Sequence, residues 1–143
     1  MTGANKGLGL ELCRQLSAEG RRVFAVCRKS SPDLQKLQVE VLEGIELKDP
    51  EIAAIKVSEA IGRRRIELFI NNAGVLIRDG PSAFSEMMVV NSLAPYVLAV
   101  KLLPNLIDHG ALLIFVSSKM GSIQLTSPSG VIGYRMSKVK RND

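Results

Sequence analysis

Near its amino-terminal end the sequence reads Thr2-Gly3-Ala4-Asn5-Lys6-Gly7-Leu8-Gly9. Its three glycines, in the spacing Gly-x-x-x-Gly-x-Gly, remove Cβ atoms where the backbone must turn sharply. Apolar residues follow at helical spacing, which is typical of a turn that opens a helix. The N–H groups of a first helical turn, together with the helix dipole, attract a pyrophosphate. On its own the pattern leaves two interpretations open, a phosphate-binding turn and an ordinary Gly-rich tail or helix start.

The composition describes one ordinary globular domain. The chain has 143 residues, of which 46% are hydrophobic and 23% charged. Aromatic residues make up 4% and tryptophan is absent, which argues against a stacking surface for single-stranded nucleic acid. His109 is the single histidine, so we expect no metal site. Cys13 and Cys27 lie in apolar segments and are expected to be free thiols in a reducing, cytoplasmic setting. No uninterrupted apolar run has the length of a membrane span, so no membrane partner is expected.

Strands and helices are predicted to alternate along the chain. Strands are expected at residues 22–28, 39–47, 66–70 and 111–116. Helices are expected at residues 8–18, from Pro32, at 50–61 and at 85–107, with Ser31 and Asp49 as N-caps. Pro95 and Pro104 each remove a backbone donor and predict a bend in the long helix. This order predicts βαβ units in an α/β domain with a parallel sheet.

Polar residues follow two of the predicted strands at the edge where such sheets bind ligands. Asn71-Asn72-Ala73-Gly74 comes after one strand and Ser117-Ser118 after the next. The segment that closes the chain contains Tyr134-Arg-Met-Ser-Lys138. Taken with the glycine turn and with Asn91 in the long helix, these patterns resemble the short-chain dehydrogenase/reductase family. The loop after Ser118 is most similar to carbonyl-reductase-like members related to the C-factor and sniffer proteins.

The resemblance implies a Ser-Tyr-Lys centre for hydride transfer. Tyr134 and Lys138, at i and i+4, project from one face of a helix, and a nearby ammonium favours the phenolate of a tyrosine. Tyr134 would then be the general acid or base, while Ser118 would stabilise charge on the substrate oxygen, with Ser122 as the fallback. By resemblance, Lys138 also holds the nicotinamide ribose and Asn91 anchors a water in a proton relay. Alternatively, Asn91 is a satisfied core amide and Ser118 caps the following turn.

The cofactor is expected to be NADP, with NAD less favoured. The strand at residues 22–28 ends at Arg28 without an acidic residue, and Lys6 adds a second cation for a 2′-phosphate. Glu46 falls where relatives usually carry an aspartate that contacts adenine. By resemblance, the cofactor-binding residues are Gly3, Asn5, Lys6, Gly7, Leu8, Gly9, Arg28, Asn72, Ala73, Gly74, Tyr134 and Lys138.

The resemblance covers residues 1–143 as a single partial dinucleotide-binding domain with a Rossmann-like, doubly wound sheet. The family's first strand, before Thr2, and its strands after Lys138 are expected to be missing, which leaves a gap of roughly 9–10 Å in the sheet. The expected function is NADP-dependent reduction of a small-molecule carbonyl or oxidation of an alcohol. The family also implies a homo-oligomer through the helix Ser85–Ile107. The alternative is a truncated, inactive fragment that acts as a nucleotide-binding or protein-interaction module.

Overall fold

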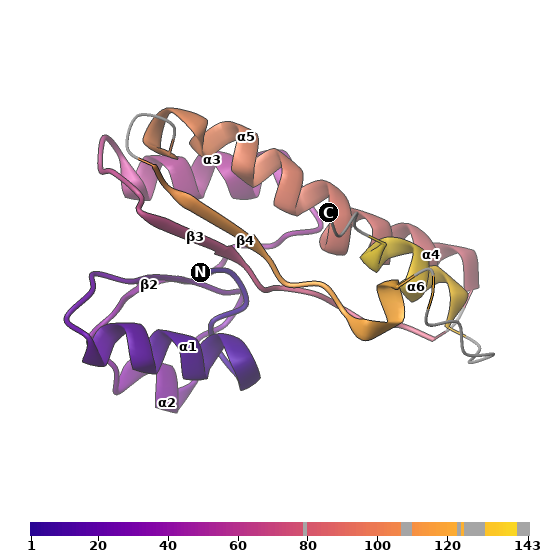
Figure 1. Cartoon of the computed structure of the whole chain (residues 1–143), viewed down its shortest axis with the longest axis horizontal. Helices are drawn as coiled ribbons and strands as arrows, with labels where there is room; N and C mark the ends of the chain where they lie inside the picture. Colours follow the sequence, from indigo (N-terminus) through magenta and orange to yellow (C-terminus); the bar gives the residue numbers. More distant parts are fainter. Residues whose placement is uncertain (79, 107–109, 123, 125–130, 140–143) are drawn as a thin grey trace.

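The computed structural model describes residues 1–78, 80–106, 110–122, 124 and 131–139 and shows an α/β fold with parallel strands (Figure 1). The strands are β1 (Phe24–Val26), β2 (Glu40–Leu42), β3 (Leu68–Asn71) and β4 (Leu112–Phe115). The helices are α1 (Gly7–Ala18), α2 (Pro32–Gln35), α3 (Pro50–Ile61), α4 (Gly80–Met88), α5 (Ala94–Leu106) and α6 (Ile132–Lys138). Two further helical turns are η1 (Val89–Leu93) and η3 (Lys119–Gly121). Ile107, the expected end of the long helix, and His109 lie outside the described residues.

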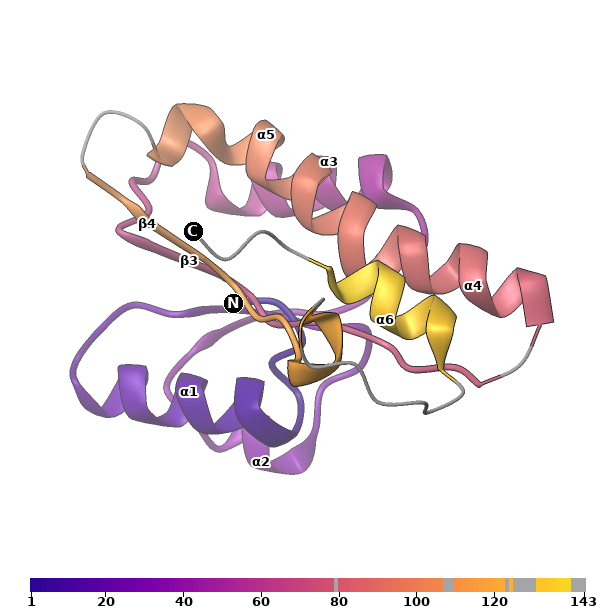
Figure 2. The ribbon, with the colours of Figure 1, turned by 45° about the vertical axis from the view of Figure 1, so that its right-hand side comes forward.

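The strands form two parallel pairs, β1 with β2 and β3 with β4. Thr2 lies between the pairs, because it forms a parallel bridge with Val26 and its N–H donates to the Ile70 carbonyl oxygen at 3.0 Å. The order is therefore β2-β1-Thr2-β3-β4, and the amino terminus lies between the two pairs (Figure 2). The prediction of an incomplete doubly wound sheet is confirmed. Met1 and Thr2 occupy the position between β1 and β3.

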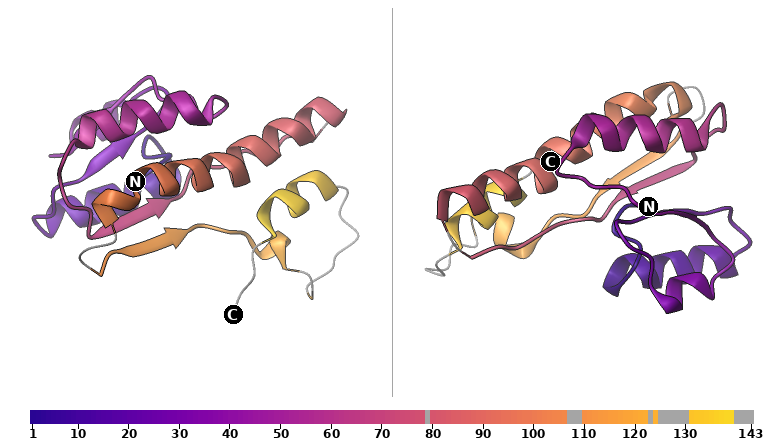
Figure 3. Two further views of the ribbon diagram at one scale, coloured as in Figure 1. Left: turned by 90° about the horizontal axis from the view of Figure 1, so that it is seen from above. Right: turned by 180° about the vertical axis from the view of Figure 1, so that it is seen from behind.

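Helices cover both faces of β1 and enclose two apolar cores. In the views of Figures 1 and 3, α3 and α5 lie side by side on one face, while α1 and α2 lie on the other. Alternate residues of β1 serve the two cores, since Val26 packs toward α3 and α5, whereas Ala25 packs toward α1 and α2. A strand buried on both faces is what its almost continuous apolar sequence predicts.

The long helix runs without interruption from Gly80 to Leu106, five residues earlier than its expected start at Ser85. At η1 it widens into a π-helical turn, in which the Ala94 N–H donates to the Val89 carbonyl. Pro95, which follows directly, has no N–H to donate, so the disturbance expected from this proline is an inserted π turn. Helix length and apolar composition alone would allow this helix to cross a membrane. Core helices of soluble proteins pass the same test, and Leu98, with other apolar residues of α5, is buried against the strands.

The local signals of the other elements are confirmed in part. Ser31 caps α2, because its Oγ accepts from the Leu34 N–H at 3.2 Å. Asp49 makes no such bond, so its expected capping role is wrong even though α3 begins at Pro50 as predicted. The second strand ends at Leu42 and not at residue 47, because Gly44 turns the chain with a φ of +74°.

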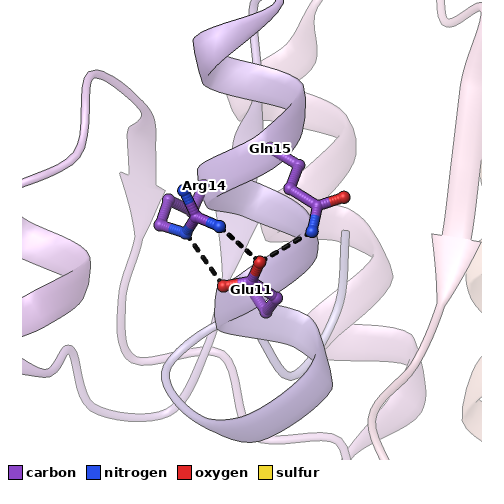
Figure 4. Close-up of polar contacts among 3 residues, drawn as sticks. All are labelled: Glu11, Arg14 and Gln15. Atoms are coloured by element: carbon purple, nitrogen blue, oxygen red, sulfur yellow. Dashed lines mark hydrogen bonds and ion pairs between the residues drawn. The ribbon is translucent and has the colours of Figure 1, made fainter.

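The exposed face of α1 carries a local ionic cluster (Figure 4). The Glu11 carboxylate accepts from Arg14 Nε at 2.8 Å and from Gln15 Nε2 at 2.6 Å. The hydrogen bond from Arg14 is the main reason why the pKa of Glu11 falls to about 2. Because these side chains lie one turn apart on the helix surface, the cluster supports α1 locally.

Candidate functional site

A groove of about 320 Å³ lies at the carboxyl ends of the strands, where parallel sheets bind ligands. We call it the carboxyl-end groove. It is lined by residues of the glycine turn, of the segments after β1 and β2, and of the loop after β3. The predicted cofactor-binding residues that it brings together are Gly3, Asn5, Lys6, Gly7, Arg28, Asn72, Ala73 and Gly74. Leu8 and Gly9 belong to the same turn but are not part of the groove lining.

Two glycines of the turn are required by close backbone packing. Gly3 has a φ of +66°, and a Cβ on it would lie 2.9 Å from the Ala73 Cα. A Cβ on Gly9 would lie 2.2 Å from the Gly3 carbonyl oxygen and 2.6 Å from Asn72 Nδ2. Real Cβ atoms do not approach other atoms this closely, so any side chain here would push the turn away from the loop after β3.

Thr2 and Asn72 join the glycine turn to that loop by hydrogen bonds. Thr2 Oγ1 accepts from the backbone N–H groups of Asn72 and Ala73, both at 3.1 Å. Asn72 Nδ2 donates in return to the Thr2 carbonyl at 3.1 Å and to the Gly3 carbonyl at 3.2 Å. Sequence reasoning missed this role of Thr2, although a threonine directly before the first glycine of the motif is the signal that could have found it.

The amino terminus of α1 is prepared for an anion. Its N-cap residue, Lys6, has extended backbone and makes no side-chain capping bond, and no acidic residue lies in the first turn. No carboxylate in the first turn of α1 therefore neutralises the partial positive charge of its first N–H groups and of the helix dipole. Lys6 and Arg28 add two cationic side chains to the lining. Glu46 and Glu86 also line the groove, and Glu86 is paired with Lys48 at 3.0 Å.

Cys27 is the one cysteine in the lining of this groove. Burial raises the pKa of its thiol, and the nearby carboxylate of Glu43 raises it further. A thiol with a raised pKa stays protonated at neutral pH and is a poor nucleophile. Among the described residues there is no cluster of three or more His, Cys, Asp or Glu side chains that could hold a metal ion.

Asn91 holds the loop after β3 against helix α6. Its side chain is buried, and its Oδ1 accepts from the Val75 N–H at 2.8 Å. Its Nδ2 donates to the Val75 carbonyl and to Ser137 Oγ, both at 2.9 Å. Ser137, buried on α6, in turn donates to the Tyr134 carbonyl at 2.8 Å. The position of Ser137 directly before Lys138 was visible in the sequence, but its link to Asn91 was not.

Ser118 and Lys138 lie on segments that pack against one another. Ser118 Oγ caps η3 by accepting from the Met120 N–H at 3.2 Å. Lys138 is buried, and its Nζ donates to the Val116 carbonyl at 3.1 Å, at the end of β4. Ser117 Oγ donates to the Lys138 carbonyl at 2.8 Å. Gly121 permits this packing, because a Cβ on it would lie 2.2 Å from that carbonyl oxygen. Ser122, the fallback for Ser118, is half-buried directly after η3.

The predicted cofactor-binding residues and the predicted catalytic residues lie next to one another at Gly74. It lines the carboxyl-end groove, and a Cβ on it would lie 3.0 Å from Lys138 Nζ and 3.2 Å from Asn91 Oδ1. The ammonium of Lys138 and the amide of Asn91 are therefore at one end of the groove. Tyr134 is half-buried one helical turn before Lys138 on α6, which packs against α4 and η3 (Figure 3). The fold thus brings Asn91 and Lys138 next to the groove that Lys6 and Arg28 line.

Comparison with known proteins gives one family for nearly the whole chain. Residues 1–139 match the family described as short chain dehydrogenase. Retinol dehydrogenase 16 of Mus musculus is 29% identical over 138 residues, which cover 87% of this chain and 44% of the relative. The chain therefore spans less than half the length of this relative.

Solved structures with the same architecture include carbonyl reductases. A carbonyl reductase from Pseudomonas aeruginosa PAO1 in complex with NADP is 30% identical, with a TM-score of 0.83 over 96% of this chain and 68% of that one. A Caenorhabditis elegans protein described as a candidate carbonyl reductase Sniffer is also 30% identical, with a TM-score of 0.81 over 96% of this chain and 70% of that one. The predicted resemblance, including its carbonyl-reductase-like branch, is confirmed.

Proposed function

Because this chain belongs to the short-chain dehydrogenase family, we propose that it is an NADP-dependent oxidoreductase that reduces a small-molecule carbonyl or oxidises an alcohol. The observation that carries the proposal is the meeting point at Gly74. There the cationic carboxyl-end groove adjoins the ammonium of Lys138 and the amide of Asn91. A bound nicotinamide cofactor would supply the hydride. Since the chain spans only part of its curated relatives, the activity of the whole protein and its substrate belong to this proposal.

The charges of the groove support NADP over NAD. Arg28 follows β1 and Lys6 precedes α1, and both side chains line the groove. A guanidinium and an ammonium favour a ligand with an extra phosphate, whereas an acidic residue after this strand would favour a free ribose hydroxyl. The similar Pseudomonas carbonyl reductase binds NADP, which agrees with this assignment.

Tyr134 and Lys138 are proposed to handle the proton. In carbonyl reduction the hydroxyl of Tyr134 would donate its proton to the substrate oxygen, and in alcohol oxidation it would accept one. Lys138 lies one helical turn after Tyr134 on the same helix, α6. Lys138 donates to the Val116 carbonyl and lies beside Gly74 of the groove, where we propose that it also serves a cofactor ribose.

Ser118 and Asn91 are proposed to support this transfer. Capping η3 occupies only an acceptor lone pair of Ser118 Oγ, so its O–H proton can still be donated to the substrate oxygen. Asn91 uses both amide hydrogens on Val75 and Ser137, which fits a positioning role. Its Oδ1 accepts a hydrogen bond from the Val75 N–H, and an amide oxygen has a second lone pair that suits the proposed relay water.

A homo-oligomer in the cytoplasm completes the proposal. The long helix exposes apolar side chains that a second copy would cover, namely Leu93, Tyr96, Val100 and Leu103. Exposed apolar groups at helical spacing are typical of helix–helix interfaces. Analytical ultracentrifugation of the chain with and without a charged substitution at Val100 tests this part.

Cofactor choice is tested by thermal unfolding with NADPH and with NADH. A cofactor at a hundred times its dissociation constant stabilises the fold by about 2.7 kcal/mol, which is roughly 10 °C for a domain of this size. Arg28→Asp is expected to remove most of the NADPH effect and to strengthen the NADH effect. Arg63→Asp, an exposed arginine at the end of α3, is the matched control and should keep the NADPH preference. Equal responses of both variants would refute the role of Arg28.

Activity is tested by following NADPH consumption with a panel of aldehydes, ketones and quinones. The chain has two tyrosines, and Tyr96 is 64% exposed on α5, so Tyr96→Phe is a matched control for Tyr134→Phe. We expect the Tyr134 variant to lose at least about 100-fold in rate and the Tyr96 variant to keep full activity. NADPH binding without turnover in the unmodified chain would favour the alternative of a nucleotide-binding module.

A further inference from the structure

Two consecutive side chains of the long helix, those of Asn91 and Ser92, bond to the same residue of α6. Asn91 Nδ2 donates to Ser137 Oγ at 2.9 Å, and Ser92 Oγ donates to the Ser137 carbonyl at 2.8 Å. In a regular α-helix consecutive side chains point in directions about 100° apart. Here both reach one residue from within the π turn η1. We call Asn91, Ser92 and Ser137 the serine clamp.

The hydroxyl of Ser137 makes two hydrogen bonds whose directions are fixed. Ser137 is completely buried, and its Oγ donates to the Tyr134 carbonyl at 2.8 Å while it accepts from Asn91. A hydroxyl has a single proton, so the bond to Tyr134 uses it and Asn91 is the donor in the other bond. The serine clamp therefore holds both the side chain and the backbone of Ser137.

Ser137 lies between the two residues that are proposed to handle the proton. Lys138 follows it directly, and Tyr134 precedes it on the same helix, which spans residues 132–138. An isolated helix this short is marginal in water, so tertiary contacts must set its position. These contacts come from α4, η1 and η3.

Further along α6, the packing against the long helix is apolar. A Cβ on Gly133 would lie 3.0 Å from Phe84 Cδ2 and 3.1 Å from Met87 Cε. Apolar contacts have no preferred direction, whereas hydrogen bonds weaken steeply when they are misaligned. The serine clamp is therefore suited to fix the rotation of α6 about its own axis, which the apolar contacts alone would leave less defined.

The rotation of α6 decides where the ammonium of Lys138 lies. Its Nζ donates to the Val116 carbonyl at 3.1 Å and would lie 3.0 Å from a Cβ on Gly74, at the end of the carboxyl-end groove. The Lys138 side chain is buried, so a turn of the helix would move the ammonium away from both.

We propose that Ser137 and Ser92 are positioning residues, which hold α6 so that Tyr134 and Lys138 face the groove. Neither serine lines the groove, so both act through the residues that they hold. The inference rests on the proposed oxidoreductase function, because it concerns the residues that are assigned to proton transfer there.

The first test measures the kinetics of NADPH consumption by the 143-residue chain and its variants. Ser137→Ala and Ser92→Ala each remove one bond of the clamp, and each should lower kcat about tenfold with an unchanged KM for the carbonyl. Ser92→Thr keeps the hydroxyl at a half-buried position and should restore most of the rate. All variants are assayed well below their unfolding temperatures, so that lost stability does not lower the rate.

Ser85→Ala is the matched control for the two alanine variants. Ser85 is exposed on α4, and its Oγ donates to the Pro81 carbonyl at 3.3 Å, which is a bond within one helix like that from Ser137 to Tyr134. It has no part in the serine clamp, so its loss should leave kcat unchanged.

A second test needs no turnover. A short pulse of acetic anhydride acetylates lysines, and mass spectrometry gives the rate at each position. Buried Lys138 should react slowly and exposed Lys56 fast in the unmodified chain. In both clamp variants the rate at Lys138 should rise about fivefold relative to Lys56, as expected when about 1 kcal/mol of local stability is lost.

The outcomes separate this proposal from the proposed function. Unchanged kcat in the two clamp variants would overturn it, even if Lys138 reacted faster, because the serines would then be merely structural. Unchanged labelling of Lys138 would overturn it as well. If the unmodified chain shows no turnover, the proposed function fails, and the labelling of Lys138 still decides whether the clamp holds α6 in place.

Discussion

Gly9→Ala is the substitution that most directly tests the cofactor turn. The added Cβ would lie 2.2 Å from the Gly3 carbonyl oxygen, which accepts a hydrogen bond from Asn72 Nδ2. Forcing this carbonyl aside costs about 1–3 kcal/mol of overpacking, and loss of the hydrogen bond adds about 1 kcal/mol. The higher helix propensity of alanine returns about 1 kcal/mol. We therefore expect a net loss of about 1–3 kcal/mol in the free energy of unfolding, together with loss of NADPH binding.

Gly20→Ala provides the control for this prediction. Gly20 follows α1 with a φ of +77°, and a Cβ on it would meet no other atom within 4 Å. The strained backbone alone costs about 1–2 kcal/mol, so both variants lose comparable stability. Chemical denaturation measures that loss, and thermal unfolding with NADPH measures the cofactor response. The Gly20 variant should keep this response and the Gly9 variant should not. A Gly9 variant that is stabilised by NADPH as strongly as the unmodified chain would refute the reasoning.

Four further predictions concern stability. Asn71 is buried and its side-chain N and O atoms have no hydrogen-bond partner, so Asn71→Leu should be neutral or stabilising by up to about 2 kcal/mol in urea denaturation. Asn91→Leu should instead cost about 2–4 kcal/mol in the same assay, because it breaks three hydrogen bonds of a buried amide. Burial lowers the pKa of the Met1 amino group from 8.0 to about 6. The unfolded chain then binds more protons between pH 6 and 8, so stability should rise by about 2–3 kcal/mol as the pH rises through this range, and amino-terminal acetylation should abolish the rise. The ionised carboxylate of Glu11 stabilises the fold, and this stabilisation is lost as the pH falls from 4.5 toward its lowered pKa of about 2. In thermal unfolding, Glu11→Gln should therefore lose less stability over this pH range than the unmodified chain.

The sequence predicts the elements well where the signal is local. Ser31-Pro32 predicts the cap and first residue of α2, and the structure has both. The same kind of signal at Asp49-Pro50 places the start of α3 correctly but not the capping bond. A side-chain cap depends on rotamer and backbone angles that neighbouring packing decides, whereas the fixed φ of proline acts alone.

The candidate site is predictable as a set of residues but not as a network. The spacing of Tyr134 and Lys138 and the glycines of the turn are visible in the sequence. The hydrogen bonds that connect them involve Thr2 and Ser137. Thr2 bonds to Asn72, which is 70 positions away in the sequence, and Ser137 bonds to Asn91, which is 46 positions away. Such pairs depend on how the strands and α6 come together, so no local pattern contains them. The π turn at η1 is likewise not contained in a local pattern. Asn91 lies in this turn and bonds to Val75 and Ser137.

Thr2 links the strands to the carboxyl-end groove. Thr2 is the last residue of the strand position and the first of the cofactor turn, and its hydroxyl holds the loop that carries Asn72 and Ala73. Backbone hydrogen bonds of Met1, Thr2 and Ala4 to β1 and β3 hold this residue in place, so the cofactor turn and the two strand pairs are joined by one short ladder of hydrogen bonds.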